Sequence, residues 1–330
     1  MDRICEMLRK RIVDVENKKV KLTKFNDLNE CMDNNCYVNC MGMGRLRRYK
    51  NFSLFLDNQE KPQKRLLRGL NPSINDFETQ VFQIMGCNMR CWYCFVDRCV
   101  LAAREGYGEW MTISDMIELF LKENHLPYII DLSGGQPDLV PEWCLWVMEE
   151  VEKRNLRDII YIWMDDNLAT THIMEKYLTQ EQISYMANYP KHSRACCFKG
   201  YNEYTYRFNV GNKCLTLEEQ VNNFRKLYNY GFDIYAYITL TGPKGSANRK
   251  DIEVFISKIQ DIHPKLPLRL IPIKIKEFTE TAERINGIQI EALEEQYRAY
   301  DIWTEVMNER FSKEEMNLPY ENVIIQNREF

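Results

Sequence analysis

Three cysteines follow an apolar run and a glycine in the stretch from Gln80 to Asp97, QVFQIMGCNMRCWYCFVD. Cys87, Cys91 and Cys94 have the spacing C-x-x-x-C-x-x-C. One loop that folds back on itself can direct all three thiolates at one inorganic centre, and three ligands leave one metal position for a molecule that is not protein. A closed zinc site takes four protein ligands, and a thioredoxin-type pair takes two. The spacing therefore favours a reactive metal centre.

With Tyr93 before the third cysteine, this stretch resembles the signature of the radical S-adenosylmethionine (radical SAM) superfamily. The resemblance implies a 4Fe-4S cluster held by Cys87, Cys91 and Cys94, whose fourth iron chelates S-adenosylmethionine (SAM). It also implies that SAM is cleaved reductively to a 5'-deoxyadenosyl radical, which abstracts a hydrogen atom from a substrate. The cleavage needs an electron at low potential, within the range that cysteine-bound clusters reach. The resemblance therefore implies an electron donor such as flavodoxin or ferredoxin.

A second motif, DLSGGQPDL, runs from Asp131 to Leu139 at the end of an apolar segment. Paired glycines there let backbone approach a ligand closely. The stretch is similar to the G-G-E-P motif of the superfamily. This resemblance implies that the methionine amino group of SAM is held by Ser133, Gly134, Gly135, Gln136 and Pro137. Gln136 stands where Glu is usual and brings no negative charge, so backbone carbonyls are expected to provide more of that contact.

Polar residues end the third and fourth predicted strands. Asp165, Asp166 and Asn167 suit ribose hydroxyls and resemble the contacts that related enzymes make to the adenosyl sugar, but they equally suit a helix cap before Thr170. The stretch around Lys199 is similar to the D-x-K pattern of glycyl-radical activating enzymes, in which the lysine neutralises the SAM carboxylate.

Cys197 stands at the Asp position of that pattern, so the acid function is not carried over. Alternation along a strand places Cys197 and Lys199 on one face and Cys196 on the other, where we expect it to be buried. If the first face is the barrel interior, Cys197 is a candidate hydrogen-atom donor or ligand of an auxiliary cluster. Lys274 and Lys276 alternate in the same way and face an anionic substrate or water.

The elements that must position these residues alternate between short apolar runs and longer helical patterns, which predicts parallel strand-helix units. The predicted strands are 80–85, 127–133, 159–165, 194–198, 234–240 and 268–275. The predicted helices lie near 112–122, 142–154, 172–188, 217–230, 250–262 and 290–311. About six such units indicate an α/β fold, and the resemblance implies a partial (β/α)6 TIM-like barrel with its reactive loops at the carboxyl ends of the strands.

Residues 1–79 are rich in Lys, Arg and Asn and show little periodicity. Cys31, Cys36 and Cys40 lie within ten residues and could bind a second iron-sulfur cluster or a zinc ion, with Cys5 or Cys99 as fourth ligand. Free thiols are the equal alternative. The basic run Arg45, Arg47, Arg48 and Lys50 is interpreted as a solvated face rather than a phosphate site. We expect an N-terminal extension that is a lid or auxiliary metal site (1–79), a barrel (80–311) and a tail (312–330).

Composition limits the class of protein further. A chain of 330 residues, 45% of them hydrophobic, can bury the core of one large domain or two modest ones. A net charge of −4 argues against nucleic acid as the main partner. The sequence has neither an apolar run of about 18 residues nor the apolar core of a signal peptide at its start, which predicts a cytoplasmic protein without membrane association. Its 12 cysteines are then reduced thiols and metal ligands.

These patterns predict a radical SAM enzyme that acts on an unidentified small molecule, peptide or protein. Two alternatives remain. One is a glycyl-radical enzyme activating protein, favoured by the lysine pattern and disfavoured by the long N-terminal extension. The other is a noncatalytic iron-sulfur or zinc-binding protein.

Overall fold

The computed structural model describes residues 2–25, 36–48, 78–123, 128–211, 215–277, 279–318 and 320–326, and within them one 11-stranded sheet. Its centre is six parallel strands in chain order: β5 (Glu78–Ile84), β7 (Ile129–Gly134), β8 (Tyr161–Asp166), β9 (His192–Phe198), β10 (Ile234–Thr239) and β11 (Leu270–Ile273). In the described part of the chain β11 pairs with β10 alone, so the sheet is curved but open. The predicted α/β fold of the partial-barrel type is confirmed.

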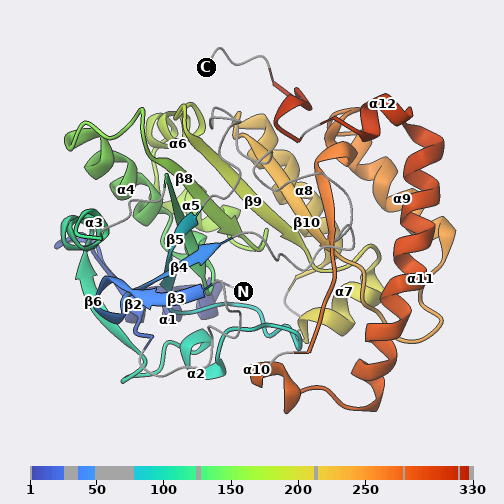
Figure 1. Ribbon diagram of the computed structural model, residues 1–330, viewed down its shortest axis with the longest axis horizontal. Coiled ribbons are helices and arrows are strands. Elements are labelled where there is room, and N and C mark those ends of the chain that lie inside the picture. Colours follow the sequence, from blue (N-terminus) through green and yellow to red (C-terminus); the bar gives the residue numbers. More distant parts are fainter. Residues whose placement is uncertain are drawn as a thin grey trace.

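Most of the helices that connect these strands cover the outer side of the sheet (Figure 1). They are α3 (Ile113–Leu121), α4 (Pro141–Lys153), α5 (Thr171–Tyr177), α6 (Gln180–Ala187), α8 (Leu217–Asn229) and α9 (Arg249–Gln260). Two short helices, α2 (Arg98–Leu101) and α7 (Glu203–Val210), lie beyond the carboxyl ends of the strands. After β11 follow α10 (Thr279–Ala282), α11 (Gly287–Arg310) and α12 (Lys313–Met316). Val221, Phe224 and Leu227 of α8 are buried, as their three and four spacing requires of a helix that packs on a sheet.

The helix predicted over 172–188 is two helices. Leu178 has extended backbone (φ −111°, ψ 146°), and Thr179 begins α6 with a capping box in which its side chain accepts from the Gln182 N–H while the Gln182 side chain accepts from the Thr179 N–H. Such a box satisfies the donors of a new helix start. The pattern Thr-x-x-Gln was present in the sequence and is the signal for this break.

The N-terminal segment contributes to the same sheet. It forms α1 (Asp2–Ile12), β1 (Val13–Asp14), β2 (Lys19–Thr23), β3 (Cys36–Asn39) and β4 (Gly44–Arg48). Strand β4 pairs antiparallel with β5, and β2 pairs antiparallel with β6 (Gly108–Thr112) and touches β5 at Leu22. Helix α1 buries Cys5, Leu8 and Ile12. Their three and four spacing in the sequence is the pattern that predicts such a helix. The domain boundary near residue 79 stays a prediction.

Side chains from the starts of the strands fill the amino-terminal end of the barrel. Ile129, Tyr161, Tyr235 and Ile271 form this inner core together with Trp163, and Trp163 meets the Tyr235 ring edge-on with centroids 5.6 Å apart. Because one end is filled, the open interior lies at the carboxyl ends of the strands. Single-turn 3-10 helices also connect the elements: η1 (Cys40–Gly42), η4 (Pro137–Leu139), η5 (Leu266–Arg269) and η6 (Tyr320–Asn322).

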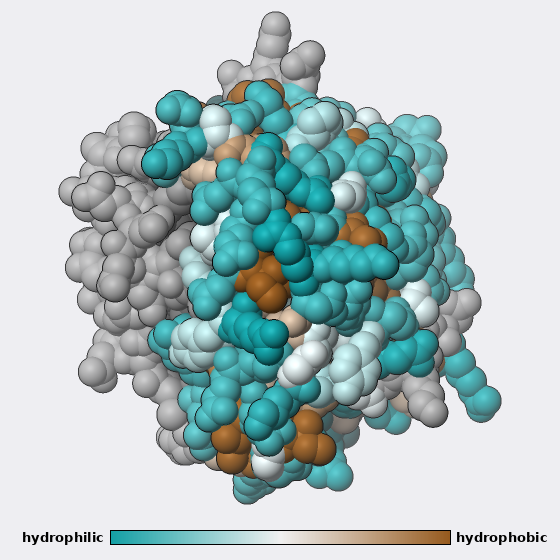
Figure 2. All heavy atoms as spheres, turned by 90° about the vertical axis from the view of Figure 1, so that its right-hand side faces the viewer, coloured by the Kyte–Doolittle hydropathy of each residue, from teal (hydrophilic) through white to brown (hydrophobic). Residues whose placement is uncertain are grey.

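The face that carries α9 and α11 is largely hydrophilic, with hydrophobic residues scattered singly (Figure 2). Arg249 of α9 pairs there with Glu253 and Glu305. Among the described helices, none combines the length and apolar character needed to cross a membrane.

Candidate active site

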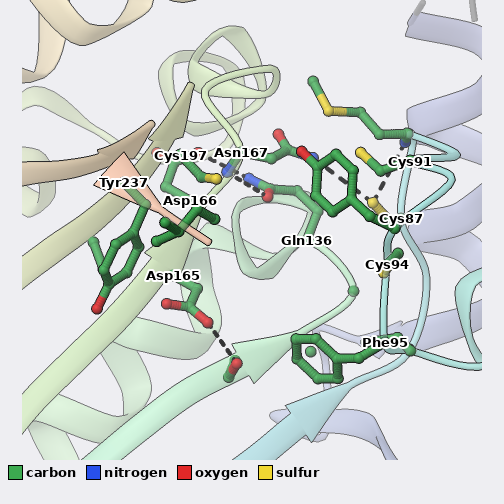
Figure 3. Close-up of a pocket in the computed structure, with 18 of the residues that line it drawn as sticks. Cys87, Cys91, Cys94, Phe95, Gln136, Asp165, Asp166, Asn167, Cys197 and Tyr237 are labelled. Atoms are coloured by element: carbon green, nitrogen blue, oxygen red, sulfur yellow. Dashed lines mark hydrogen bonds between the residues drawn. The ribbon is translucent and has the colours of Figure 1, made fainter. Parts of the chain in front are cut away.

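One cavity of about 270 Å³ at the carboxyl ends of the strands brings the predicted site residues together (Figure 3). Figure 3 shows Cys87, Cys91 and Cys94 along one wall and Asp165, Cys197 and Tyr237 along the opposite wall. The other predicted residues that line it are Tyr93, Ser133, Gly134, Gly135, Gln136, Asp166, Asn167 and Lys199. Pro137 is instead buried as the first residue of η4, below the lining.

The cysteine loop is held by hydrogen bonds from several elements. The N–H groups of Gly86 and Cys87 donate to carbonyls of α2 at 3.0 Å each. Arg90 Nη1 donates to the Cys87 carbonyl at 2.5 Å, and Arg284 Nη1 donates to the Cys94 carbonyl at 2.6 Å. Sequence reasoning missed both arginines, because a side chain that binds loop carbonyls leaves no motif. These contacts orient the loop so that its three thiols share one cavity.

Burial favours the protonated form of the three thiols when no cation is bound to them. Burial raises the pKa of Cys91 and of Cys94 to about 11 and raises the pKa of Cys87, whereas the charge of Lys199 acts in the opposite sense on all three. A bound metal overcomes this cost, because thiolate coordination releases the proton.

The spacing of these ligands differs from that of a single-ion site. Among the described residues, no three His, Cys, Asp or Glu side chains are gathered closely enough to bind one metal ion. In a 4Fe-4S cluster each thiolate binds a different iron, and three cysteines along one wall of a cavity suit that arrangement. Asn167 Nδ2 and the Met89 N–H approach Cys87 Sγ at 3.7 and 3.4 Å. Hydrogen bonds to sulfur tune the potential of such clusters.

Asn209 of α7 ties the cysteine loop to two strand ends. Its Oδ1 accepts from Trp92 Nε1 at 3.0 Å, and its Nδ2 donates to the carbonyls of Lys199 and Thr241 at 2.8 and 2.9 Å. Beside it, Tyr93 OH lies 3.0 Å from Thr239 Oγ1. Sequence reasoning missed Asn209 together with the helix that carries it, although the capping box of Asn202 and Thr205 marked that helix.

Gly134 and Gly135 are required by contact with β5. A Cβ on Gly135 would stand 1.9 Å from the Gly86 carbonyl oxygen, and Gly134 has φ +108°. The Gly135 N–H donates to the Ile84 carbonyl at 2.9 Å, and the Gln136 N–H donates to the Gly86 carbonyl at 2.8 Å. The sequence predicted glycines that make room for a ligand. In the structure Gly134 makes room for Ile84 of β5, and Gly135 makes room for Gly86, the residue before Cys87.

The side chain of Gln136 lies in a buried network under the cavity. Its Nε2 donates to Asp166 Oδ1 and Thr170 Oγ1 at 3.0 and 2.8 Å, and its Oε1 accepts from the Asn167 N–H at 2.9 Å. Arg194 Nη1 lies 3.4 Å from Asp166 Oδ2 and 2.6 Å from Asp138 Oδ2, with all three side chains fully buried. Burial raises the pKa of Asp138 to about 7, although the charge of Arg194 opposes that rise.

The three polar residues after β8 have different surroundings. Asp166 Oδ1 and Asn167 Oδ1 accept from the N–H groups of Leu168 and Ala169, which stabilises the turn before α5. Asp165 faces the cavity, and its Oδ2 accepts from Ser133 Oγ at 2.5 Å. Burial raises the pKa of Asp165 in spite of that hydrogen bond and of the positive charges of Lys199, Arg47 and Arg45.

Cys197 and Lys199 both line the cavity, whereas Cys196 is buried on the opposite face of β9. Burial by itself lowers the pKa of Lys199, but the nearby side chains of Cys197, Tyr93 and Cys91 raise it well above its ordinary value. Lys199 therefore carries a positive charge next to the cysteine loop.

Residues 83–258, more than half of the chain, match the family model described as the radical SAM superfamily. The chain belongs to the radical SAM superfamily. The family makes it an enzyme that binds a 4Fe-4S cluster and SAM. No curated protein sequence matches the chain.

Several solved structures are similar to this radical SAM enzyme. A radical SAM methyltransferase from Sphaerobacter thermophilus is 11% identical with a TM-score of 0.46, over 86% of this chain and 74% of that one. SuiB of Streptococcus suis bound to S-adenosylmethionine is 12% identical with a TM-score of 0.42, over 68% of this chain and 47% of that one. The chain spans less than half the length of the SuiB structures that it matches.

The basic run after the third N-terminal cysteine is partly inside this radical SAM barrel. It was predicted to be a solvated face, but Arg45 is 4% exposed, and both Arg45 and Arg47 line the cavity. The reason is that β4 pairs with β5, so alternate residues of β4 face the interior. Lys274 also lines the cavity. Lys276 is exposed, because β11 ends at Ile273 and its alternation stops there.

Among the N-terminal cysteines, Cys31 and the side chain of Cys36 lie outside the described residues. Elsewhere in the chain, Cys214 and His125 also lie outside them. Cys40 is buried, and its N–H donates to Glu123 Oε1 at 2.8 Å. Burial and the Glu123 carboxylate raise the pKa of the Cys40 thiol far above its ordinary value. Cys5 belongs to the core under α1, and Cys99 accepts from Arg104 Nη1 at 3.5 Å. A second metal centre stays a prediction.

Proposed function

We propose that this radical SAM enzyme binds its cluster through Cys87, Cys91 and Cys94 and abstracts a hydrogen atom from a small molecule, peptide or protein held in the barrel. When bound, the cluster and SAM would supply the radical chemistry, in which SAM is cleaved reductively to a 5'-deoxyadenosyl radical. One observation carries the assignment: the three thiols, the Gly134–Gly135 turn and the cation of Lys199 line a single cavity. We further propose that the enzyme works in the cytoplasm with flavodoxin or ferredoxin as electron donor.

The remaining lining residues have roles that follow from their chemistry. Lys199 neutralises the carboxylate of SAM, because its ammonium stays charged beside the cysteine loop. Backbone carbonyls of the turn at Gly134 and Gly135 accept from the methionine amino group, since the Gln136 side chain is engaged below. Asp165 suits the ribose hydroxyls, Asn167 holds the turn before α5 beside Cys87, and Asp166 positions Gln136.

Cys197 is a candidate hydrogen-atom donor to the substrate. Its thiol lies in the cavity on the same strand end as Lys199. Transfer of the S–H hydrogen atom to a substrate radical quenches that radical and leaves a thiyl radical. One electron from the flavodoxin or ferredoxin and one proton from solvent then restore the thiol, so the step balances.

Anaerobic formation of 5'-deoxyadenosine under dithionite tests the assignment. Wild-type protein should form it, and the triple variant Cys87→Ala, Cys91→Ala, Cys94→Ala should form none. Cys144→Ala is the matched control, because Cys144 is buried in α4 outside the cavity. A triple variant that still forms 5'-deoxyadenosine would make the assignment wrong.

A second candidate function is activation of a glycyl-radical enzyme, which the placement of Lys199 in the cavity favours. In that case the hydrogen atom comes from a glycine Cα of a partner protein. Electron paramagnetic resonance of a mixture with a candidate partner distinguishes the two, because a glycyl radical persists on the partner after SAM is consumed.

A further inference from the structure

Two guanidinium groups enter the barrel from a strand that precedes it in the chain. Arg45 and Arg47 lie on β4 and line the cavity, while Leu46 between them is buried on the opposite side of the sheet. β4 is antiparallel to β5 and therefore adds a seventh strand to the wall of the barrel. The planar fork of an arginine matches carboxylate and phosphate oxygens, and two on one face match them better.

Aromatic rings fix the guanidinium of Arg45 next to the cysteine loop. Its Cζ lies 5.3 Å from the ring centroid of Phe25 and 5.5 Å from that of Phe95. Phe95 directly follows Cys94, and both line the cavity. An arginine held between two rings keeps its direction at little entropic cost on binding. A group bound to Arg45 is consequently held beside the cavity wall that carries Cys87, Cys91 and Cys94, where the 5'-deoxyadenosyl radical of the proposed function would form.

The cavity is divided by charge. Arg45 faces Val81 across the sheet, Val81 faces Asp131, and Asp131 faces Trp163, so these four residues form one row along the wall. The small Val81 side chain separates the arginine side from the acids Asp131 and Asp165.

Neither arginine belongs to the stretches that hold the cluster and SAM, which come from the ends of β5, β7, β8 and β9. We propose that Arg45 and Arg47 form a subsite for an anionic group of the substrate, a carboxylate or a phosphate. The inference rests on the proposed function, because it identifies the anionic molecule with the substrate of the radical reaction. The N-terminal segment thereby contributes a specificity-determining surface to the barrel.

Anaerobic calorimetric titration of the reconstituted full-length protein, with SAM bound, tests the subsite. The probes are inorganic phosphate and glutarate. Wild type should bind at least one of them, and Arg45→Gln/Arg47→Gln should bind it at least about tenfold more weakly, the effect expected for charged hydrogen bonds. Lys122→Gln/Lys153→Gln removes the same charge from side chains that are 73% and 72% exposed, and should bind as wild type does.

Arg47→Gln alone is the second variant, because Arg45 is buried and its loss can unfold the protein. Unfolding is checked by the thermal transition and the cluster absorbance. A folded Arg47→Gln protein with wild-type affinity for the probe overturns the subsite, and so does a wild type that binds neither probe. Binding of phosphate alone or of glutarate alone supports it and identifies the group. The titration needs no SAM cleavage, so a wild type that binds the probe but forms no 5'-deoxyadenosine overturns the proposed function alone.

Discussion

Gln136 donates a hydrogen bond to the carboxylate of Asp166 across 3.0 Å, and that carboxylate lies 3.4 Å from the buried guanidinium of Arg194. The oxygen of the same amide accepts from the Asn167 N–H, so one side chain joins the ends of β7 and β8. The superfamily motif has Glu at this position. In this chain a glutamate would place a second carboxylate against Asp166, where burial makes like charges costly.

We predict that Gln136→Glu weakens SAM binding by about 5-fold to 140-fold, which corresponds to the roughly 1–3 kcal/mol of a buried polar group left without its partner. The measurement is calorimetric titration of SAM into the reconstituted protein. Gln136→Glu/Asp166→Asn should recover most of the affinity, because a new amide can donate to the new carboxylate while the net charge around Arg194 is unchanged. Wild-type affinity in the single variant would show that Gln136 does not position the turn.

We predict that Gly135→Ala prevents stable cluster binding. The added Cβ would stand 1.9 Å from the Gly86 carbonyl oxygen, so the turn and the loop that begins at Cys87 must separate. Iron content and cluster absorbance after reconstitution measure the effect. Gly287→Ala is the control, since a Cβ there meets no atom within 4 Å. Full cluster occupancy in Gly135→Ala would contradict the close packing of the two segments.

The sequence predicted most strands and helices of the barrel because buried parallel strands are apolar runs and the covering helices repeat at three and four. Local sequence pattern could not predict which strands pair with each other. The composition of the basic run that begins at Arg45 is typical of a solvated segment, but the antiparallel pairing of β4 with β5 directs Arg45 and Arg47 into the cavity. Asn209 was missed for a related reason: its hydrogen bonds reach the cysteine loop and two strand ends far away in the chain.

The candidate site was predictable where motif spacing fixes geometry, as at Cys87, Cys91 and Cys94. It was less predictable where neighbours compete for a side chain. Asp166 and Asn167 suit a sugar by type, but a turn and a buried network use their oxygens. The position of Gln136 in the motif predicts a contact with a ligand, but its amide already makes hydrogen bonds to Asp166, Thr170 and the Asn167 N–H. Residue type therefore predicted the location of the site better than the role of each side chain.

We predict that Lys199→Met weakens the binding of SAM by about tenfold while leaving the binding of 5'-methylthioadenosine unchanged. The second ligand lacks the amino acid carboxylate that Lys199 is proposed to neutralise, so the comparison isolates that contact. Titration of both ligands provides the measurement, and Lys276→Met, at an exposed lysine, is the control. An equal loss for both ligands would assign Lys199 a structural role instead.

We predict that Arg9→Met destabilises the fold by about 3 kcal/mol, the usual cost of breaking a buried ion pair. Arg9 makes two hydrogen bonds to Glu142 at 2.7 and 2.9 Å and one to the Leu139 carbonyl at 2.7 Å, which docks α1 against the segment that follows the Gly134–Gly135 turn. Urea unfolding measures the change. Arg9→Met/Glu142→Met should recover part of it, and Arg11→Met, at an exposed position, should change little. A loss below about 1 kcal/mol in Arg9→Met would contradict this docking.

The last prediction concerns the N-terminal cysteines. Strand β3 is extended from Cys36 to Asn39, so the backbone positions of Cys36 and Asn39 are about 10 Å apart at 3.3 Å per residue, and Cys40 follows at the start of η1. A zinc site draws its ligands together, with each thiolate about 2.3 Å from the ion, and an extended backbone does not favour such a site. Beside Cys40, the Glu123 carboxylate adds negative charge where an anionic cluster would have to bind.

We therefore expect neither iron nor zinc above background in the reconstituted variant Cys87→Ala, Cys91→Ala, Cys94→Ala, as measured by elemental analysis. The control is the same variant with Cys31, Cys36 and Cys40 also replaced, which sets the background for adventitious metal. Metal that is present in the first variant and absent from the second would show a second centre. It would also show that β3 rearranges when the metal binds, because its backbone is extended from Cys36 to Asn39.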